Sequence, residues 1–150
     1  MDATERLLAI EAIKQLKAHY FRCMDSKEFD GLNTVFADDA TFDFREALRD
    51  PIDGTPQPFE EHAPVTGRKQ IVDHIASALS EGVSIHHGHT PEITLTSDTT
   101  ADGIWAMEDV VKKDSFSFHG WGHYWETYVR TSAGWRIKTS RLTRLRVEID

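Results

Sequence analysis

The chain has 150 residues, of which 39% are hydrophobic and 10% aromatic, and it carries a formal net charge of -8 at pH 7. This length fits one ordinary domain that buries its own core, so we expect residues 1–150 to form a single domain. The negative charge argues against nucleic acid and anionic membranes as partners, while small neutral, apolar or cationic ligands stay open.

Cysteine usage and hydropathy favour a cytoplasmic protein. Cys23 is the only cysteine, which excludes an internal disulfide and a thiolate zinc cluster. The first residues lack the basic and apolar stretches of a secretion signal, and no apolar run approaches the roughly 18 residues that cross a bilayer. We therefore expect a reducing, cytoplasmic setting and no membrane contact.

The first half of the chain predicts helices, one short strand and a long loop. Apolar residues recur every three or four positions in the first segment, and Asp25 with Ser26 offers capping groups for the second. The loop is rich in proline and poor in aliphatic residues, so a lid over a pocket and a plain surface excursion are equally open. The predicted helices are 4–24, 27–36 and 66–79, the strand is 41–44, and the loop is 45–64.

The second half predicts an antiparallel meander, because β-branched and aromatic residues alternate between short turn segments. Helices followed by long strands indicate an α+β fold, with the helices packed on one face of a strongly curved sheet. Apolar residues occupy both parities of the third long strand, so one of its faces should meet helices or a cavity and the other a partner subunit. The four predicted strands are 83–95, 101–113, 115–131 and 135–149.

Asp25 is the first candidate for chemistry. It directly follows the apolar stripe of the first helix, where the helix dipole disfavours a negative charge. The simpler interpretation is that Asp25 caps the next helix. The Tyr20 side chain would point in the same direction as Asp25 only if the first helix ends near Met24. Core packing is the alternative role of Tyr20.

A histidine cluster at 84–89 holds three of the eight histidines. His87, His89 and Glu92 come close to the spacing of a cupin metal site, although Glu92 lies one residue too near. Solvated or packed histidines are the simpler interpretation, and we expect no metal.

The last two candidates lie on strands. Odd positions of the last strand are mostly apolar and even positions cationic, yet Arg141 has the apolar parity, where an unpaired guanidinium is costly. Asp109 shares its parity with Trp105 on the second long strand. Both charged residues are expected to line one cavity, with a structural ion pair as the alternative for Arg141.

Several segments together resemble the SnoaL-like branch of the nuclear-transport-factor-2-like superfamily. The resemblance implies a cone-shaped, curved antiparallel sheet wrapped around N-terminal helices, with an internal pocket. The superfamily also contains isomerases, cyclases, hydrolases and non-catalytic binders, so it says less about the reaction. The segments that carry the resemblance are the first helix with Asp25, and residues 36–40, 85–88, 122–124 and 134–137.

Within that superfamily the chain is most similar to cofactor-free lyases of the scytalone dehydratase, hexachlorocyclohexane dehydrochlorinase and bile-acid 7α-dehydratase type. Their Asp-His pair falls on Asp25 and His86, and further site residues of the bile-acid type fall on Tyr20, Asp109 and Arg141. Simple alternation would instead point His87 inward. Choosing His86 requires a bulge near Gly88 or Pro91, or an apolar outer face covered by another subunit.

The resemblance therefore predicts a cofactor-independent lyase that acts on a small hydrophobic, aromatic or alicyclic substrate. His86 would act as general base, Asp25 would fix its tautomer, and Tyr20 or Arg141 would stabilise developing charge. An isomerase or aldol-type cyclase with the same pair, or a non-catalytic binding domain, stays open. We expect a homodimer or homotrimer and no cofactor. The candidate pocket walls are Trp105, Trp121, Phe42 and Phe44, with core packing as their alternative role.

Overall fold

The computed structural model describes residues 1–56 and 63–150. Helix α1 (Ala3–Asp25) begins with a capping box, in which the Asp2 side chain accepts the Glu5 N–H and the Glu5 side chain accepts the Asp2 N–H. Its buried stripe includes Ile13, Tyr20 and Met24. The predicted first helix is confirmed, and its end at Asp25 brings that carboxylate to the edge of the core.

The other helices differ from the prediction in detail. The second is a six-residue 3-10 helix, η1 (Phe29–Thr34), and it has no side-chain cap. Asp25 therefore does not cap it, and that interpretation is wrong. Helix α2 (Arg68–Leu79) begins slightly later than predicted, because Thr66 pairs with β1 in a short strand instead.

A six-stranded sheet in the order β2-β1-β6-β5-β4-β3 forms the body of the molecule. Neighbouring strands from β3 to β6 are antiparallel, as predicted, but β1 runs parallel to β6, so the expectation of a purely antiparallel sheet is wrong. No hairpin turn joins β1 to β6, so local geometry leaves their relative direction open. The strands are β1 (Phe36–Asp43), β2 (Val65–Thr66), β3 (Val83–Leu95), β4 (Thr100–Lys112), β5 (Ser117–Thr131) and β6 (Gly134–Ile149).

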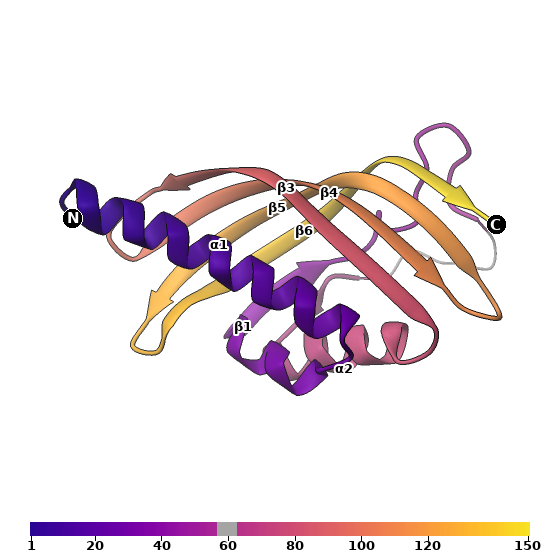
Figure 1. The fold of residues 1–150 in the computed structure, drawn as a ribbon, viewed down its shortest axis with the longest axis horizontal. Coiled ribbons are helices and arrows are strands. Elements are labelled where there is room, and N and C mark those ends of the chain that lie inside the picture. Colours follow the sequence, from indigo (N-terminus) through magenta and orange to yellow (C-terminus); the bar gives the residue numbers. More distant parts are fainter. Residues whose placement is uncertain (57–62) are drawn as a thin grey trace.

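The long strands curve strongly, and α1 crosses them on one face, with η1 and α2 beside its C-terminal part (Figure 1). The inner face of the sheet carries the core, which includes Trp105, Tyr124, Tyr128 and Ile137. The opposite face exposes large apolar side chains. The α+β fold with a curved sheet around N-terminal helices is confirmed.

Bulges decide which side chains of β3 and β6 face inward. In β3 the register shifts between His89 and Glu92, so His86 shares the inner face with the core while His87 is exposed. The pairing of β6 with β5 shifts twice. Between these two shifts the even positions are buried, so Arg144 points inward and Arg141 outward. The predicted inward position of Arg141 is therefore wrong.

Gly122 explains why one of these bulges is possible. A Cβ atom added at this residue would lie 1.9 Å from the Thr143 carbonyl oxygen, a distance that no side chain tolerates. Gly122 sits at the register shift between Trp121 and Gly122, next to the β6 backbone at Thr143. Glycine is thus required there for backbone packing.

A buried ion pair crosses the core beneath the helix. Lys17 Nζ lies 2.9 Å from Glu126 Oε2, and both side chains are fully buried. Glu126 also accepts hydrogen bonds from Tyr128 and Ser140, at 2.8 and 2.7 Å. Burial, partly opposed by Glu126, holds the pKa of Lys17 below its ordinary value.

Candidate active site

A cavity of about 310 Å³ lies between the helices, the inner face of the sheet and the segment after β1. A larger open hollow of about 990 Å³ lies elsewhere, but no histidine lines it, and its Lys138 and Arg68 are paired with Asp39 and Asp38. The smaller cavity contains polar groups with chemistry to offer, so we take it as the candidate site. Its polar lining includes Tyr20, Arg45, His74, His86, Asp109, Lys113, Tyr124 and Arg144.

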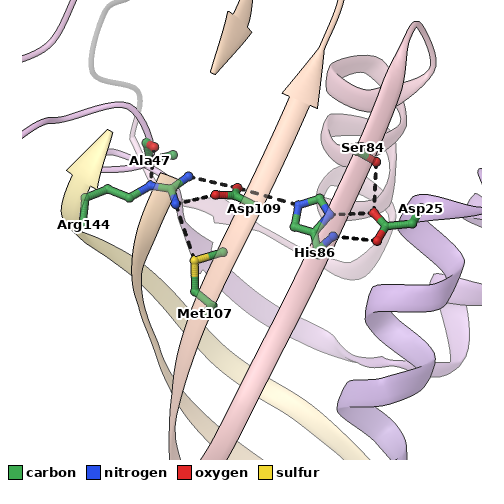
Figure 2. A network of polar contacts seen from close by, with 7 residues as sticks. All are labelled: Asp25, Ala47, Ser84, His86, Met107, Asp109 and Arg144. Atoms are coloured by element: carbon green, nitrogen blue, oxygen red, sulfur yellow. Dashed lines mark hydrogen bonds and ion pairs between the residues drawn. The ribbon is translucent and has the colours of Figure 1, made fainter. Parts of the chain in front are cut away.

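Asp25 and His86 form a tightly held pair (Figure 2). Asp25 Oδ1 lies 2.7 Å from His86 Nδ1, and its Oδ2 accepts the His86 backbone N–H at 2.7 Å. The Ser84 hydroxyl donates to Oδ1 at 3.0 Å. A carboxylate that accepts the Nδ1 proton leaves Nε2 of the neutral imidazole as a proton acceptor, and His86 lines the cavity.

Asp109 and Arg144 continue this row across the sheet, as Figure 2 shows. His86 Nε2 lies 3.8 Å from Asp109 Oδ2. Arg144 binds both oxygens of Asp109, at 2.7 and 3.0 Å, and donates from Nε to the Ala47 carbonyl at 2.7 Å. The guanidinium is therefore neutralised and its orientation is fixed by partners on two sides.

Two phenols complete the polar part of the cavity. The ring centroids of Tyr20 and Tyr124 are 6.0 Å apart, edge to face. Burial first, and then nearby Tyr124 and Glu126, raises the pKa of Tyr20 well above its ordinary value, and burial likewise raises the pKa of Tyr124. Both hydroxyls stay protonated at neutral pH.

The cavity thus brings together most of the residues predicted from the sequence. Tyr20, His86 and Asp109 line it, and Asp25 supports His86 from behind. Phe42 and Phe44 form one wall, with their rings stacked at 3.8 Å between centroids, and His74 stacks on Phe44 at 4.6 Å.

Arg141, Trp105 and Trp121 lie elsewhere. The Arg141 side chain is 51% exposed and faces Glu46 at 3.7 Å. Trp105 is buried on the inner face but outside the cavity lining, and its indole N–H donates to Tyr128 at 2.9 Å. Trp121 has the outward parity of β5 and stacks on His119.

Sequence reasoning missed Arg144, Tyr124, His74 and Lys113. Tyr124 shares its parity with Phe118, so alternation alone would have placed it inward. Arg144 carried the outward parity of an unbroken β6, and only the bulges reveal it. His74 gave no signal, since a lone histidine on a helix is more often solvated.

The metal alternative finds no support in the geometry. His87 and His89 lie on the exposed side of β3. Within residues 1–56 and 63–150, no group of three or more histidine, cysteine or carboxylate side chains is placed to hold a metal ion.

The segment after β1 closes one side of the cavity. Arg45, Ala47, Leu48 and Thr55 line it, while residues 57–62 of the predicted loop lie outside the described residues. Asp50 anchors this segment to β6, because its carboxylate accepts the Val147 N–H at 2.7 Å. That bond, above all, lowers the pKa of Asp50 from 3.8 to about 2.

The sequence and the fold agree on a family. A family model for the SnoaL-like domain matches residues 5–141. The chain belongs to the SnoaL-like domain family. As expected for a SnoaL-like domain, the cavity lies between the helices and the curved sheet. No helix in the described part of this SnoaL-like chain is long and apolar enough to span a membrane.

Solved structures with the same fold include enzymes. A hexachlorocyclohexane dehydrochlorinase, LinA-type3 from Novosphingobium barchaimii, is 16% identical, with a TM-score of 0.77 over 99% of this chain and 94% of that one. A candidate scytalone dehydratase from Novosphingobium aromaticivorans is 18% identical, with a TM-score of 0.76 over 98% and 91%. The Kfla4162 protein from Kribbella flavida is 20% identical, with a TM-score of 0.79 over 95% of both chains. At these identities the likeness establishes the fold alone.

Proposed function

We propose that this protein is a cofactor-independent lyase that eliminates a small group from an aromatic or alicyclic substrate. The observation that carries the proposal is the Asp25-His86 pair, whose Nδ1 is bound by a carboxylate while the histidine lines a largely apolar cavity. This is the arrangement of a positioned general base. Similarity of fold to a dehydrochlorinase and to a candidate dehydratase supports the same reaction class.

In the proposed reaction, His86 Nε2 takes a proton from a substrate carbon. The electron pair of that C–H bond forms a new double bond to the neighbouring carbon, and the bond from that carbon to the leaving oxygen or halide breaks, with its electron pair departing on that atom. For loss of a carbonyl fragment, His86 instead takes the proton of a substrate hydroxyl, whose oxygen becomes the carbonyl as the C–C bond breaks. The electron pair of the C–C bond stays on the ring compound, which recovers the proton from His86. Asp25 stabilises the imidazolium that forms. A positioned base of this kind contributes about 10² to 10⁴ in rate.

The two phenols are the proposed donors to developing negative charge. Tyr20 and Tyr124 both line the cavity and are protonated at neutral pH, so a phenolic O–H can donate to a substrate oxygen. Arg144, and not Arg141, is the β6 arginine that lines the cavity. Because Asp109 already binds the Arg144 guanidinium, the proposed role of Arg144 is to orient Asp109 beside His86.

The test is a D₂O incubation with hydroxylated, halogenated and carbonyl-bearing ring compounds, followed by NMR and mass spectrometry. We expect loss of water, halide or a carbonyl fragment. His86→Ala and Asp25→Asn should each reduce the rate about 10²- to 10⁴-fold, and His87→Ala, an exposed neighbour, should leave it unchanged. Deuterium uptake without mass loss would indicate an isomerase or cyclase, and binding without exchange a non-catalytic domain.

We propose further that a second copy covers the outer face of the sheet. Val83 is 59% exposed, Ile85 45%, Trp125 39% and Leu145 64%, and these four residues lie on β3, β5 and β6. Monomers seldom expose a large apolar patch without a partner. A homodimer or homotrimer would bury these residues.

A further inference from the structure

The cavity differs in charge from the rest of the molecule. Although the chain carries a net charge of -8, the described residues that line the cavity include three cations, Arg45, Lys113 and Arg144, and one carboxylate, Asp109. Cationic lining in an acidic protein concentrates anions locally against the long-range repulsion. Whole-chain charge is therefore a poor guide to the ligand of this cavity.

Only one of these cations is available to a ligand. Arg144 is held by both oxygens of Asp109. Arg45 is held by both oxygens of Asp43, at 3.0 and 2.7 Å. For Lys113, no carboxylate within residues 1–56 and 63–150 lies at ion-pair distance, and the side chain is half-buried at the cavity wall.

Strand geometry separates Lys113 from the Asp25-His86 pair. Asp109 pairs with His86, Val111 follows it on the inner face, and Lys113 comes directly after the end of β4 and lines the same cavity. At about 3.3 Å per residue, the backbones of Asp109 and Lys113 are about 13 Å apart. The wall between them is apolar, formed by Val111 and by Phe118, its partner on β5.

From these placements we infer that the substrate carries a carboxylate, which binds Lys113 at the end of the cavity opposite His86. The opposite orientation is disfavoured, because Asp25 and Asp109 already place two carboxylates next to His86 and would repel a third. The apolar body of the substrate then lies against Val111 and Phe118. The reacting carbon reaches His86, so Lys113 sets both specificity and orientation.

The inference rests on the proposed function for the position of the reacting carbon, but ligand binding can be tested without turnover. Suitable probes are phenylacetate, 3-phenylpropionate and 4-phenylbutyrate, each with its methyl ester. Affinities are measured by calorimetry and ligand-observed NMR for the wild type, Lys113→Gln and Lys113→Arg. The matched control is Lys112→Gln, which removes the same charge from the preceding residue, on the exposed side of the strand.

We expect at least one acid to bind about tenfold more tightly than its ester, as one charge-assisted hydrogen bond would give. Lys113→Gln should abolish this preference, and Lys113→Arg and Lys112→Gln should retain it. The inference would be overturned by equal affinities for acid and ester, by equal effects of Lys113→Gln and Lys112→Gln, or by no binding of any acid. The preference should also persist in His86→Ala, so a failure of the proposed elimination would be recognised separately.

Discussion

Arg144 provides the sharpest test of how the bulges in β6 build the site. Replacing it with methionine leaves Asp109 buried without its partner, since the two side chains are only 1% and 4% exposed. Removal of one member of a buried pair costs about 3 to 5 kcal/mol. For a domain of this length we expect the melting temperature to fall by about 6 to 20 °C.

Arg141→Met is the matched control, with the same substitution three residues earlier on the same strand. Its guanidinium is half-exposed and its ion pair with Glu46 is 3.7 Å long, so we expect a loss below about 1 kcal/mol. Free energies of unfolding would come from urea titrations followed by circular dichroism. The double variant Arg144→Met/Asp109→Asn should recover at least about 1 kcal/mol relative to Arg144→Met.

Equal losses for Arg144→Met and Arg141→Met would refute the assignment of Arg144 to the inner face. A double variant no more stable than Arg144→Met would show that the unpaired carboxylate is not the source of the cost. Near-ultraviolet circular dichroism at neutral pH checks that each variant retains its tertiary packing.

Other features of the structure lead to separate expectations. Asp50 has a pKa of about 2 in the folded protein against an ordinary 3.8, so the stabilisation by its carboxylate is complete above about pH 4 and is lost as the pH falls toward 2. In acid titrations, the difference in free energy of unfolding between wild type and Asp50→Asn should therefore shrink over that range. A constant difference would contradict this reasoning. Gly122→Ala should lower the free energy of unfolding by about 1 to 3 kcal/mol, because the alanine Cβ would meet the Thr143 carbonyl. An unchanged urea midpoint would show that the backbone adapts freely. Leu145→Glu should convert an oligomer to a monomer in light scattering, and wild-type protein that is already monomeric would rule out the second copy.

Much of the fold could be predicted from local sequence patterns. The stripe of α1 and the alternation of β4 each bury one face of a regular element, and such a pattern depends only on the local repeat of the backbone. The family resemblance also selected Asp25 and His86 correctly as neighbours, and the structure confirms their contact at 2.7 Å. The direction of β1 beside β6 was beyond prediction, because the two strands meet only in the tertiary structure.

The candidate site shows where local patterns stop being sufficient. An extra residue in a strand reverses the inward and outward positions of every residue that follows, and the sequence does not mark where that extra residue sits. His86 lies inward together with Ser84, against the apolar alternation of β3, because the register shift between His89 and Glu92 changes which positions of the strand face the core. As a result, Ile85 and Val83 expose apolar surface on the other face. Arg144 replaces Arg141 because β6 is bulged on either side of the segment that contains Arg141.

The amino-acid sequence by itself determined most of the element types and the α+β class, since these follow from periodicity, while its resemblance to a known family pointed to the family and to the Asp25-His86 pair. Only the tertiary structure decided which arginine pairs with Asp109, that Lys113 shares a cavity wall with His86, and that Trp121 lies outside. The physical reason is that cavities form where distant strands are brought together. Their register depends on backbone contacts, such as that of Gly122 with Thr143, that no single segment encodes.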